Sequence, residues 1–137
     1  MKKKILLFIL FISIFITGCD KKESLVCKNE TSDTGSKTSL TLEIRFINGK
    51  ITSVSEDGLV KFDSTYKKYI KSYKESLDSM YDDEDLNYTS STNNDEVNFK
   101  VTNKDKKIEK MLDKLNIKDK EKNKIRKELE ERGYSCK

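Results

Sequence analysis

The sequence of 137 residues contains no proline, histidine, tryptophan, alanine or glutamine. Without histidine, the protein has no imidazole general base, no Ser-His or Cys-His nucleophile pair and no His-ligated metal site. Hydrophobic residues make up 34% of the chain and charged residues 38%, so it can build at most one small domain with a thin core. These shortages argue against an enzyme, and we expect no catalytic residue, no metal and no cofactor.

The first nineteen residues combine a basic start, an apolar stretch and a cysteine. Lys2–Lys4 precede the apolar run 5–16. This run is too short to cross about 30 Å of hydrocarbon as a helix, and it is typical of an export signal. It ends in an Ile-Thr-Gly-Cys motif whose last residue is Cys19. The motif resembles the lipobox of bacterial lipoproteins, in which a branched apolar residue and two small residues precede a lipidated cysteine.

The lipobox resemblance implies that residues 1–18 are a signal peptide, that a peptidase cuts between Gly18 and Cys19, and that the Cys19 thiol carries a diacylglycerol. Residues 19–23 would then be a lipid-anchored tether and residues 24–137 a single small domain. Two acyl chains suffice for stable attachment, here to the extracytoplasmic face of the cell membrane. The alternative is an ordinary secretory signal or an uncleaved anchor with an unrelated cysteine.

Removal of the leader changes the charge of the protein. Lys2–Lys4 leave with it, so 25 of the 28 Lys and Arg residues remain against 24 Asp and Glu residues. The formal net charge falls from +4 to about +1. The basic balance therefore belongs to the export signal, and a nearly neutral domain gives no support for a nucleic-acid partner.

The other two cysteines, Cys27 and Cys136, lie near the two ends of the predicted domain. An extracytoplasmic compartment permits disulfides, so we predict a Cys27–Cys136 bridge. Such a bridge closes a loop of over 100 residues and is worth roughly 4.7 kcal/mol if the stabilisation is entropic. Two reduced thiols are the alternative. A redox role is disfavoured because no CxxC spacing is present.

Apolar and polar residues alternate in 40–46 and 97–101, which predicts half-buried strands. The apolar residues of 24–30 predict a first strand, and 50–62 is predicted to be the strand that returns after 40–46. The polar segments 31–39 and 81–94 are predicted to be loops.

The Asn48-Gly49 pair predicts a tight hairpin between two of these strands, because both residues tolerate positive φ. A strict two-residue turn would place Ser53 opposite Ile44 and Val54 opposite Glu43. Because this register sets apolar residues against polar ones, we expect a bulge or a three-residue loop.

Seven apolar or aromatic residues recur at helical spacing after a possible cap at Asp63 or Ser64. They are Tyr66, Tyr69, Ile70, Tyr73, Leu77, Met80 and Tyr81. At 100° per residue they fall within an arc of about 120°, which predicts one long amphipathic helix. Two shorter helices are predicted further on, at 108–115 and from Asp119 to Gly133.

The acidic segment after this helix partly matches a calcium-binding loop. Asp83, Asp85 and Asn87 have the spacing of the first three ligands. Tyr88 and Asn94 stand where the loop needs Gly and a bidentate Glu. We therefore interpret the segment as a solvated acidic loop.

The predicted fold class is α+β: a small antiparallel sheet, made of a β-hairpin and flanking strands, packed against one long amphipathic helix, with two short C-terminal helices. This order of elements, with Gly133-Tyr134 after the last helix, resembles the small YehR-like lipoproteins of unknown function. The resemblance implies an α+β fold, a surface-anchored domain and no catalytic residues. The cysteine pair departs from that family. The ending from Gly133 to Lys137 is similar to that of small lipoproteins of low-GC Gram-positive bacteria, in which the two cysteines would pair.

These observations predict a membrane-anchored extracytoplasmic lipoprotein with a non-enzymatic, binding or structural role at the cell envelope. Its partners would be the membrane, through the diacylglycerol on Cys19, and an unknown envelope protein or small ligand. Three alternatives stay open: an envelope enzyme that uses a carboxylate pair, an immunity or sensor lipoprotein, and a peptide pheromone cut from the leader. Phe11–Gly18 resembles the octapeptide sex pheromones of enterococcal lipoprotein leaders.

Overall fold

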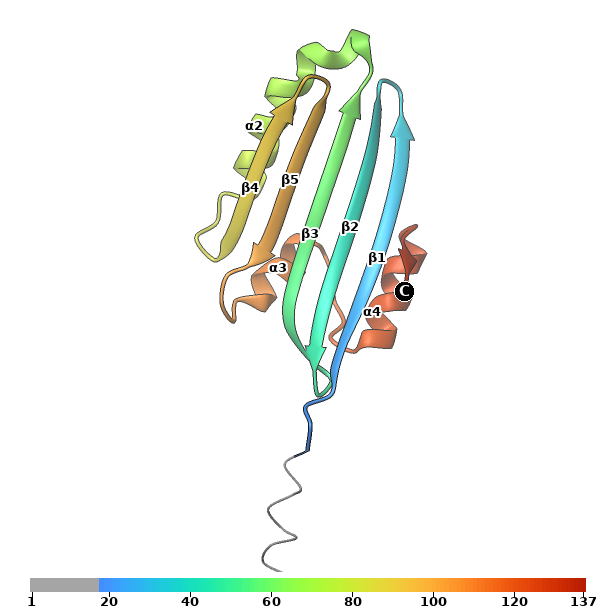
Figure 1. Cartoon of the computed structure of the whole chain (residues 1–137), viewed down its shortest axis with the longest axis vertical. Helices are drawn as coiled ribbons and strands as arrows, with labels where there is room; N and C mark the ends of the chain where they lie inside the picture. Colours follow the sequence, from blue (N-terminus) through green and yellow to red (C-terminus); the bar gives the residue numbers. More distant parts are fainter. Residues whose placement is uncertain (1–17) are drawn as a thin grey trace, which may run out of the picture.

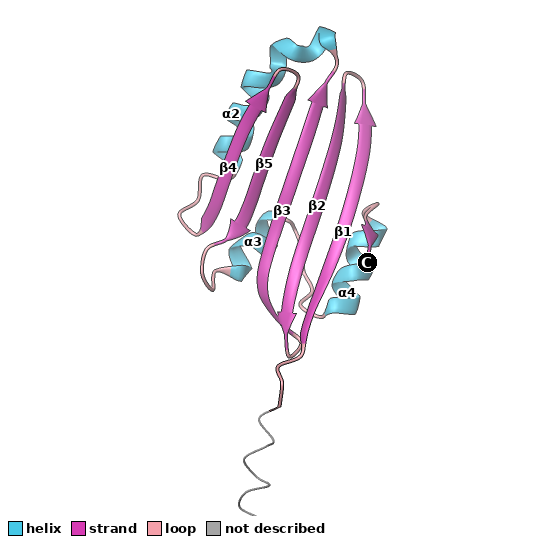
Figure 2. Cartoon of the chain, viewed as in Figure 1, coloured by secondary structure: helices cyan, strands magenta, loops and turns pink. Residues whose placement is uncertain are grey.

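A computed structural model describes residues 18–137 of the protein. Six strands form one antiparallel sheet in the order β4-β5-β3-β2-β1-β6, and the helices lie behind it (Figures 1 and 2). The strands are β1 (Lys22–Asp33), β2 (Ser36–Ile47), β3 (Lys50–Phe62), β4 (Leu86–Asn93), β5 (Glu96–Asn103) and β6 (Ser135–Cys136). The helices are the 3-10 helix η1 (Ser64–Tyr69), α2 (Ile70–Met80), α3 (Ile108–Lys114) and α4 (Lys122–Glu131).

The hairpin between β2 and β3 contains the predicted bulge. Asn48 and Gly49 form the turn with φ values of 52° and 77°, and the register shifts by one residue between Arg45 and Phe46. The shift places Val54 opposite Ile44. The bulge therefore keeps the apolar residues of both strands on one face, which a register slip of one residue would reverse.

The two segments predicted to be loops are mostly strand, so that prediction is wrong. Strands β1 and β2 continue through residues 31–39 and leave only a short turn around Gly35. Within 81–94, residues Leu86–Asn93 form β4, which pairs with β5 along its whole length. Strand ends and edge strands contribute few side chains to a core, so they do not need the apolar alternation that marked the other strands.

The prediction of an α+β fold with a small sheet packed against one long helix is also wrong. The sheet dominates the domain, and the segment from Tyr66 to Tyr81 is split between η1 and α2. The Tyr66 ring covers Gly35, where an added Cβ would lie 2.2 Å from the ring. The Asp63 N–H also donates to the Gly35 carbonyl (2.9 Å). This attachment to the β1–β2 turn holds the start of the segment outside a regular α-helix.

The two short C-terminal helices are present near the predicted positions, as α3 and α4. Asn116 follows α3 with φ 52°, and Gly133 follows α4 with φ 90°. The Ile117 N–H donates to the Leu112 carbonyl (2.9 Å) and the Tyr134 N–H to the Leu129 carbonyl (3.0 Å). Both ends thus use a left-handed residue to satisfy free carbonyls.

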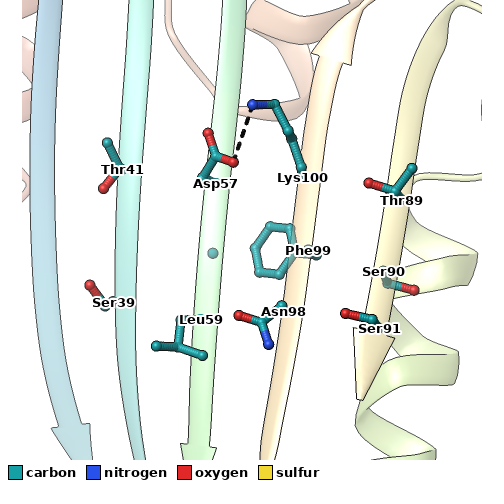
Figure 3. Close-up of a pocket in the computed structure, with 11 residues that line it drawn as sticks. Ser39, Thr41, Asp57, Leu59, Thr89, Ser90, Ser91, Asn98, Phe99 and Lys100 are labelled. Atoms are coloured by element: carbon teal, nitrogen blue, oxygen red, sulfur yellow. Dashed lines mark ion pairs between the residues drawn. The ribbon is translucent and has the colours of Figure 1, made fainter. Parts of the chain in front are cut away.

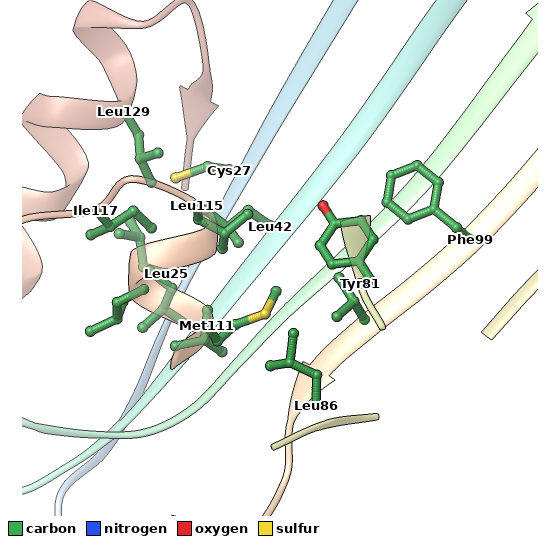
Figure 4. Close-up of a cluster of buried hydrophobic side chains, with 14 of the residues drawn as sticks. Leu25, Cys27, Leu42, Tyr81, Leu86, Phe99, Met111, Leu115, Ile117 and Leu129 are labelled. Atoms are coloured by element: carbon green, nitrogen blue, oxygen red, sulfur yellow. The ribbon is translucent and has the colours of Figure 1, made fainter. Parts of the chain in front are cut away.

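The core lies between one face of the sheet and the helices. Alternate residues of β1, β2, β3 and β5 are buried, whereas their neighbours are more exposed. Figure 4 shows part of this cluster, in which side chains of α3 and α4 and of the segment between them meet the central strands. We name this the covered face and the opposite side of the sheet the open face. Three helices bury side chains in this core. These side chains are Leu77 of α2, Met111 and Leu112 of α3, and Ile125 and Leu129 of α4.

Candidate functional site

The open face of the sheet contains a shallow depression of about 400 Å³ over β2, β3, β5 and β4. Small hydroxyl side chains form its two sides: Ser39 and Thr41 on β2, and Thr89 and Ser91 on β4 (Figure 3). Larger polar side chains of the central strands rise between them. The open-face positions of β2 and β4 here hold small Ser and Thr side chains, and no helix of the described residues covers this face.

The depression is lined by both polar and apolar side chains, among them Leu59, and holds one ion pair. Lys100 Nζ lies 3.4 Å from Asp57 Oδ1, and about half of each side chain is exposed. Asn98 adds an amide beside this pair, and Phe99, which also lines the depression, is almost fully buried. The site therefore offers hydrogen-bond donors and acceptors to a polar ligand, and it presents no exposed aromatic surface for stacking.

The covered face contains an ionisable residue, Glu56, that is not among the predicted site residues. Glu56 is only 4% exposed, and the Tyr81 hydroxyl donates to its carboxylate at 2.9 Å. Burial raises the pKa of Glu56, although the Tyr81 hydrogen bond and the charge of Arg132 act in the opposite direction. Burial also raises the pKa of Tyr81, and the nearby carboxylate of Glu56 adds to this effect.

The buried Glu56 does not form the pair of carboxylates that a glycosidase mechanism requires. Asp57, the next acidic residue along β3, lies on the open face. Within residues 18–137, Glu56 is the acidic side chain that is buried. The geometry therefore places one carboxylate in the core, and no second buried carboxylate among the described residues faces it.

The predicted disulfide between Cys27 and Cys136 is confirmed. The two Cα atoms lie 4.0 Å apart, because β6 pairs with β1 so that these residues are directly opposite. Two backbone hydrogen bonds between Val26 and Lys137 (2.8 and 3.1 Å) hold this pairing. The bridge fastens the C-terminus to the first strand.

Cys19, the predicted lipidation residue, is exposed and lies outside this disulfide. The following residues are attached to the β2–β3 turn: Asn48 donates to Asp20 Oδ1 (2.8 Å), and its own Oδ1 accepts from the Lys21 N–H (2.9 Å). Strand β1 then begins at Lys22. Of the predicted cleavage site, Gly18 and Cys19 are described, while the rest of the predicted signal peptide and pheromone, residues 1–17, lies outside the described residues.

Two of the acidic residues that partly match a calcium loop, Asp83 and Asp85, form contacts with other residues of the domain. The Asp85 N–H donates to Asp83 Oδ1 at 2.9 Å, and this bond lowers the pKa of Asp83. Lys110 lies 3.6 Å from Asp83, and Lys107 lies 3.4 Å from Asp85. The described part of the chain contains no cluster of three or more acidic or Cys side chains arranged to hold a metal.

None of the helices in residues 18–137 has both the length and the apolar character needed to cross a bilayer.

No family model matches the sequence, and no curated protein matches it. Among solved structures, the chain is similar to one described as the NMR structure of a protein from Streptococcus pneumoniae TIGR4. The similarity covers 85% of this chain and 86% of the other, with a TM-score of 0.51 and 15% sequence identity. At this identity the likeness concerns the fold alone.

One signal in the sequence does place Glu56. Val54 and Val60 are apolar residues of the same predicted strand, and they have the same parity as Glu56. Since side chains on a strand alternate between its faces, Glu56 must share the face of these valines. The polar neighbours Ser55 and Asp57 weaken this signal, because three polar residues in a row are typical of a solvated segment.

Proposed function

We propose that the protein is a lipoprotein held on the extracytoplasmic face of the cell membrane by a diacylglycerol on Cys19, and that its domain has a non-enzymatic binding role at the envelope. One observation carries the proposal: a basic start, an apolar run and an Ile-Thr-Gly-Cys motif ending at Cys19 are followed within three residues by the first strand. An export signal that ends in a cysteine able to carry a lipid is what a lipid-anchored protein requires.

The Cys27–Cys136 disulfide supports this proposal. Disulfides persist in oxidising, extracytoplasmic compartments and are rare where thiols are kept reduced. The bridge also provides stability that a domain with few hydrophobic residues needs. Export and the disulfide are therefore mutually consistent.

The contacts of Asp20 and Lys21 indicate which end of the domain would lie next to the membrane. Both residues bond to Asn48 at the β2–β3 turn, so a lipid on Cys19 would hold this end of the sheet next to the membrane. The far end of the sheet, which contains the β1–β2 and β4–β5 turns, would point away from the membrane (Figure 1). The open face would then be presented along the side of the anchored domain.

The binding role is supported by the open face. Its depression offers hydroxyl, amide and charged groups from four adjacent strands, and the carboxylate chemistry of the enzyme alternative lacks its second buried carboxylate among the described residues. A partner on this surface would be recognised by hydrogen bonds. The resemblance to YehR-like lipoproteins is part of the same proposal.

The anchor is tested by expressing the full chain and its Cys19→Ser variant in a Gram-positive host and separating membranes from soluble material. We expect the parent protein in the membrane fraction, with a mature N-terminal peptide that begins at Cys19 and carries the mass of a diacylglycerol. The Cys19→Ser variant should keep its signal peptide and lack the lipid mass. Identical processing of the two proteins would refute the anchor.

The binding role is tested by affinity capture from the same membranes, with Thr41→Lys as a matched control. This substitution fills the depression with a long charged side chain at an open-face position and leaves the core unchanged. We expect mass spectrometry to find an envelope component that the parent captures and the variant does not. Equal capture by both proteins would remove the open face from the proposal.

A further inference from the structure

Strand β4 is an edge of the sheet, and three of its residues direct their backbone polar groups outward. The Lys104 N–H donates to the Asp85 carbonyl at 2.9 Å, so Asp85 bonds toward β5. In an antiparallel pair the bonding residues alternate. Tyr88, Ser90 and Thr92 therefore point their N–H and C=O groups away from β5, and no strand among residues 18–137 lies beyond them.

The β4 edge lacks the charges, prolines and bulges that protect many exposed edges. Natural edge strands carry charges, prolines or bulges that prevent another strand from pairing with them. Strand β4, with the sequence Leu-Asn-Tyr-Thr-Ser-Ser-Thr-Asn, has none of these in a chain that is 38% charged. The opposite edge is different: β1 carries five charged residues, and β6 covers part of it.

A hollow of about 380 Å³ lies beside β4 on the side of the covered face. Tyr88 and Ser90 of β4 line it together with Asp78, Asp82 and Asp83. Asp78 is already paired with Lys74 (Nζ–Oδ2 2.6 Å), and this pair together with the hydroxyls of Ser90 (2.7 Å) and Tyr88 (3.0 Å) lowers its pKa to about 2. Asp82 is exposed and forms no ion pair with another described residue.

The position of the hollow decides which side chain it can accept. In a strand added next to β4, a residue opposite Tyr88 or Ser90 would point its side chain to the same face as they do. That side chain would enter the hollow and meet carboxylates. A second copy of β4 has no basic residue to place there, so the charge favours a strand from another protein.

We propose that the free edge of β4 binds an extended segment of a partner protein, which adds a seventh strand to the sheet and places a Lys or Arg side chain in the hollow next to Asp78 and Asp82. Backbone hydrogen bonds to Tyr88, Ser90 and Thr92 hold the added strand, and the hollow makes the site specific for a segment with a basic side chain. This goes beyond the open-face binding proposed above, because it assigns a different surface of the same domain and names the class of partner that this surface takes.

The test uses residues 20–137, since every strand and helix of the described residues, and the disulfide, lie between Lys22 and Cys136. The probe is a capped, fluorescein-labelled nonapeptide of alternating Thr and Val with one central Arg, and its twin has a central Glu. Fluorescence anisotropy measures both affinities. We expect the Arg peptide to bind about five- to tenfold more tightly, the gain that one or two partly exposed ion pairs give.

Three variants distinguish the edge from other surfaces. Thr92→Pro removes one outward N–H without touching the β4–β5 ladder, and it should abolish binding of the Arg peptide, whereas Thr92→Val should retain it. Asp82→Asn should reduce the preference for Arg over Glu severalfold. Asp33→Asn, which changes an exposed carboxylate on β1, away from both the open-face depression and the hollow, should leave that preference unchanged.

The proposal fails if the two peptides bind equally, if neither binds at millimolar concentration, or if Thr92→Pro and Asp82→Asn both bind like the parent. If the fragment dimerises and Thr92→Pro abolishes the dimer, the β4 edge binds a second copy of the chain, and the proposal is also overturned. Because the fragment carries no lipid, these outcomes are independent of the anchor on Cys19.

Discussion

Glu56 and Asp57 are neighbours in β3, but their carboxyl groups lie on opposite faces of the sheet and in opposite environments. Glu56 is 4% exposed and accepts a hydrogen bond from Tyr81. Asp57 is half exposed and pairs with Lys100 across the open face. The same residue chemistry thus becomes a buried group with a raised pKa on one face and a solvated ion pair on the other.

The contrast extends across the whole sheet. The covered-face row through Glu56 consists of Cys27, Leu42, Glu56, Val101 and Tyr88. The row one residue further along consists of Lys28, Thr41, Asp57, Lys100 and Thr89, and all but Lys28 line the open-face depression. The residues of the covered-face row therefore stabilise the fold, whereas those of the open-face row provide the groups that a ligand could contact.

The largest expected effect comes from removing the disulfide on the covered face. The double variant Cys27→Ser and Cys136→Ser should lose about 4 kcal/mol of unfolding free energy, because the bridge joins residues separated by 109 positions. Urea unfolding followed by circular dichroism measures this loss. Cys19→Ser is the control and should unfold like the parent, and a loss below about 1 kcal/mol for the double variant would contradict the role of the bridge.

A second prediction compares adjacent residues of β1. Leu25 is fully buried on the covered face, and Val26 is half-buried on the open face. Leu25→Ala should lose about 3 kcal/mol, because it removes side-chain contacts and leaves a cavity, whereas Val26→Ala should lose less than about 1 kcal/mol. Thermal and urea unfolding of both variants check the difference. Equal losses would mean that the open face is covered in solution.

The covered face could be predicted from the sequence where apolar residues alternate. The bulge near Arg45 followed from the need to keep Ile44 and Val54 on one face, and the structure has it. Strand β4 could not be predicted, because an edge strand of Ser, Thr and Asn gives no apolar signal. The long helix was predicted from spacing alone, which did not show that Tyr66 packs on Gly35.

The functional residues divide in the same way. Cys27 and Cys136 were predicted as a pair because cysteines in an exported domain have few other uses. The open-face depression was not predicted, because it depends on which strands become neighbours: β4 and β2 both contribute to it, although they are far apart in the sequence. Register and strand order are properties of the folded sheet, and a single polar strand does not reveal them.

A third prediction concerns the pH dependence of stability that the buried Glu56 causes. Burial raises the pKa of Glu56 above its unfolded value, so the folded state binds the proton more tightly than the unfolded state does. The stability from this group is fully present below the unfolded pKa and is lost as pH rises through the folded pKa. Glu56→Gln should lose this dependence, so its stability relative to the parent should increase from pH 4 to pH 8.

The size of that increase is about 1.4 kcal/mol for each unit by which the pKa is raised. Urea unfolding of the parent and of Glu56→Gln at several pH values measures it. Parallel pH curves for the parent and Glu56→Gln would show that the buried carboxyl titrates normally.

The smallest expected effect is on the open face itself. Lys100→Met breaks the ion pair with Asp57 and should change the unfolding free energy by no more than about 0.5 kcal/mol, because exposed pairs at this distance gain little and are screened by salt. Urea unfolding at low and high salt measures this change, which should be smaller at high salt. A loss of 2 kcal/mol or more would show that the open face contributes to folding. A negligible loss would leave Asp57 and Lys100 free to contact a partner, because the fold does not depend on their pairing.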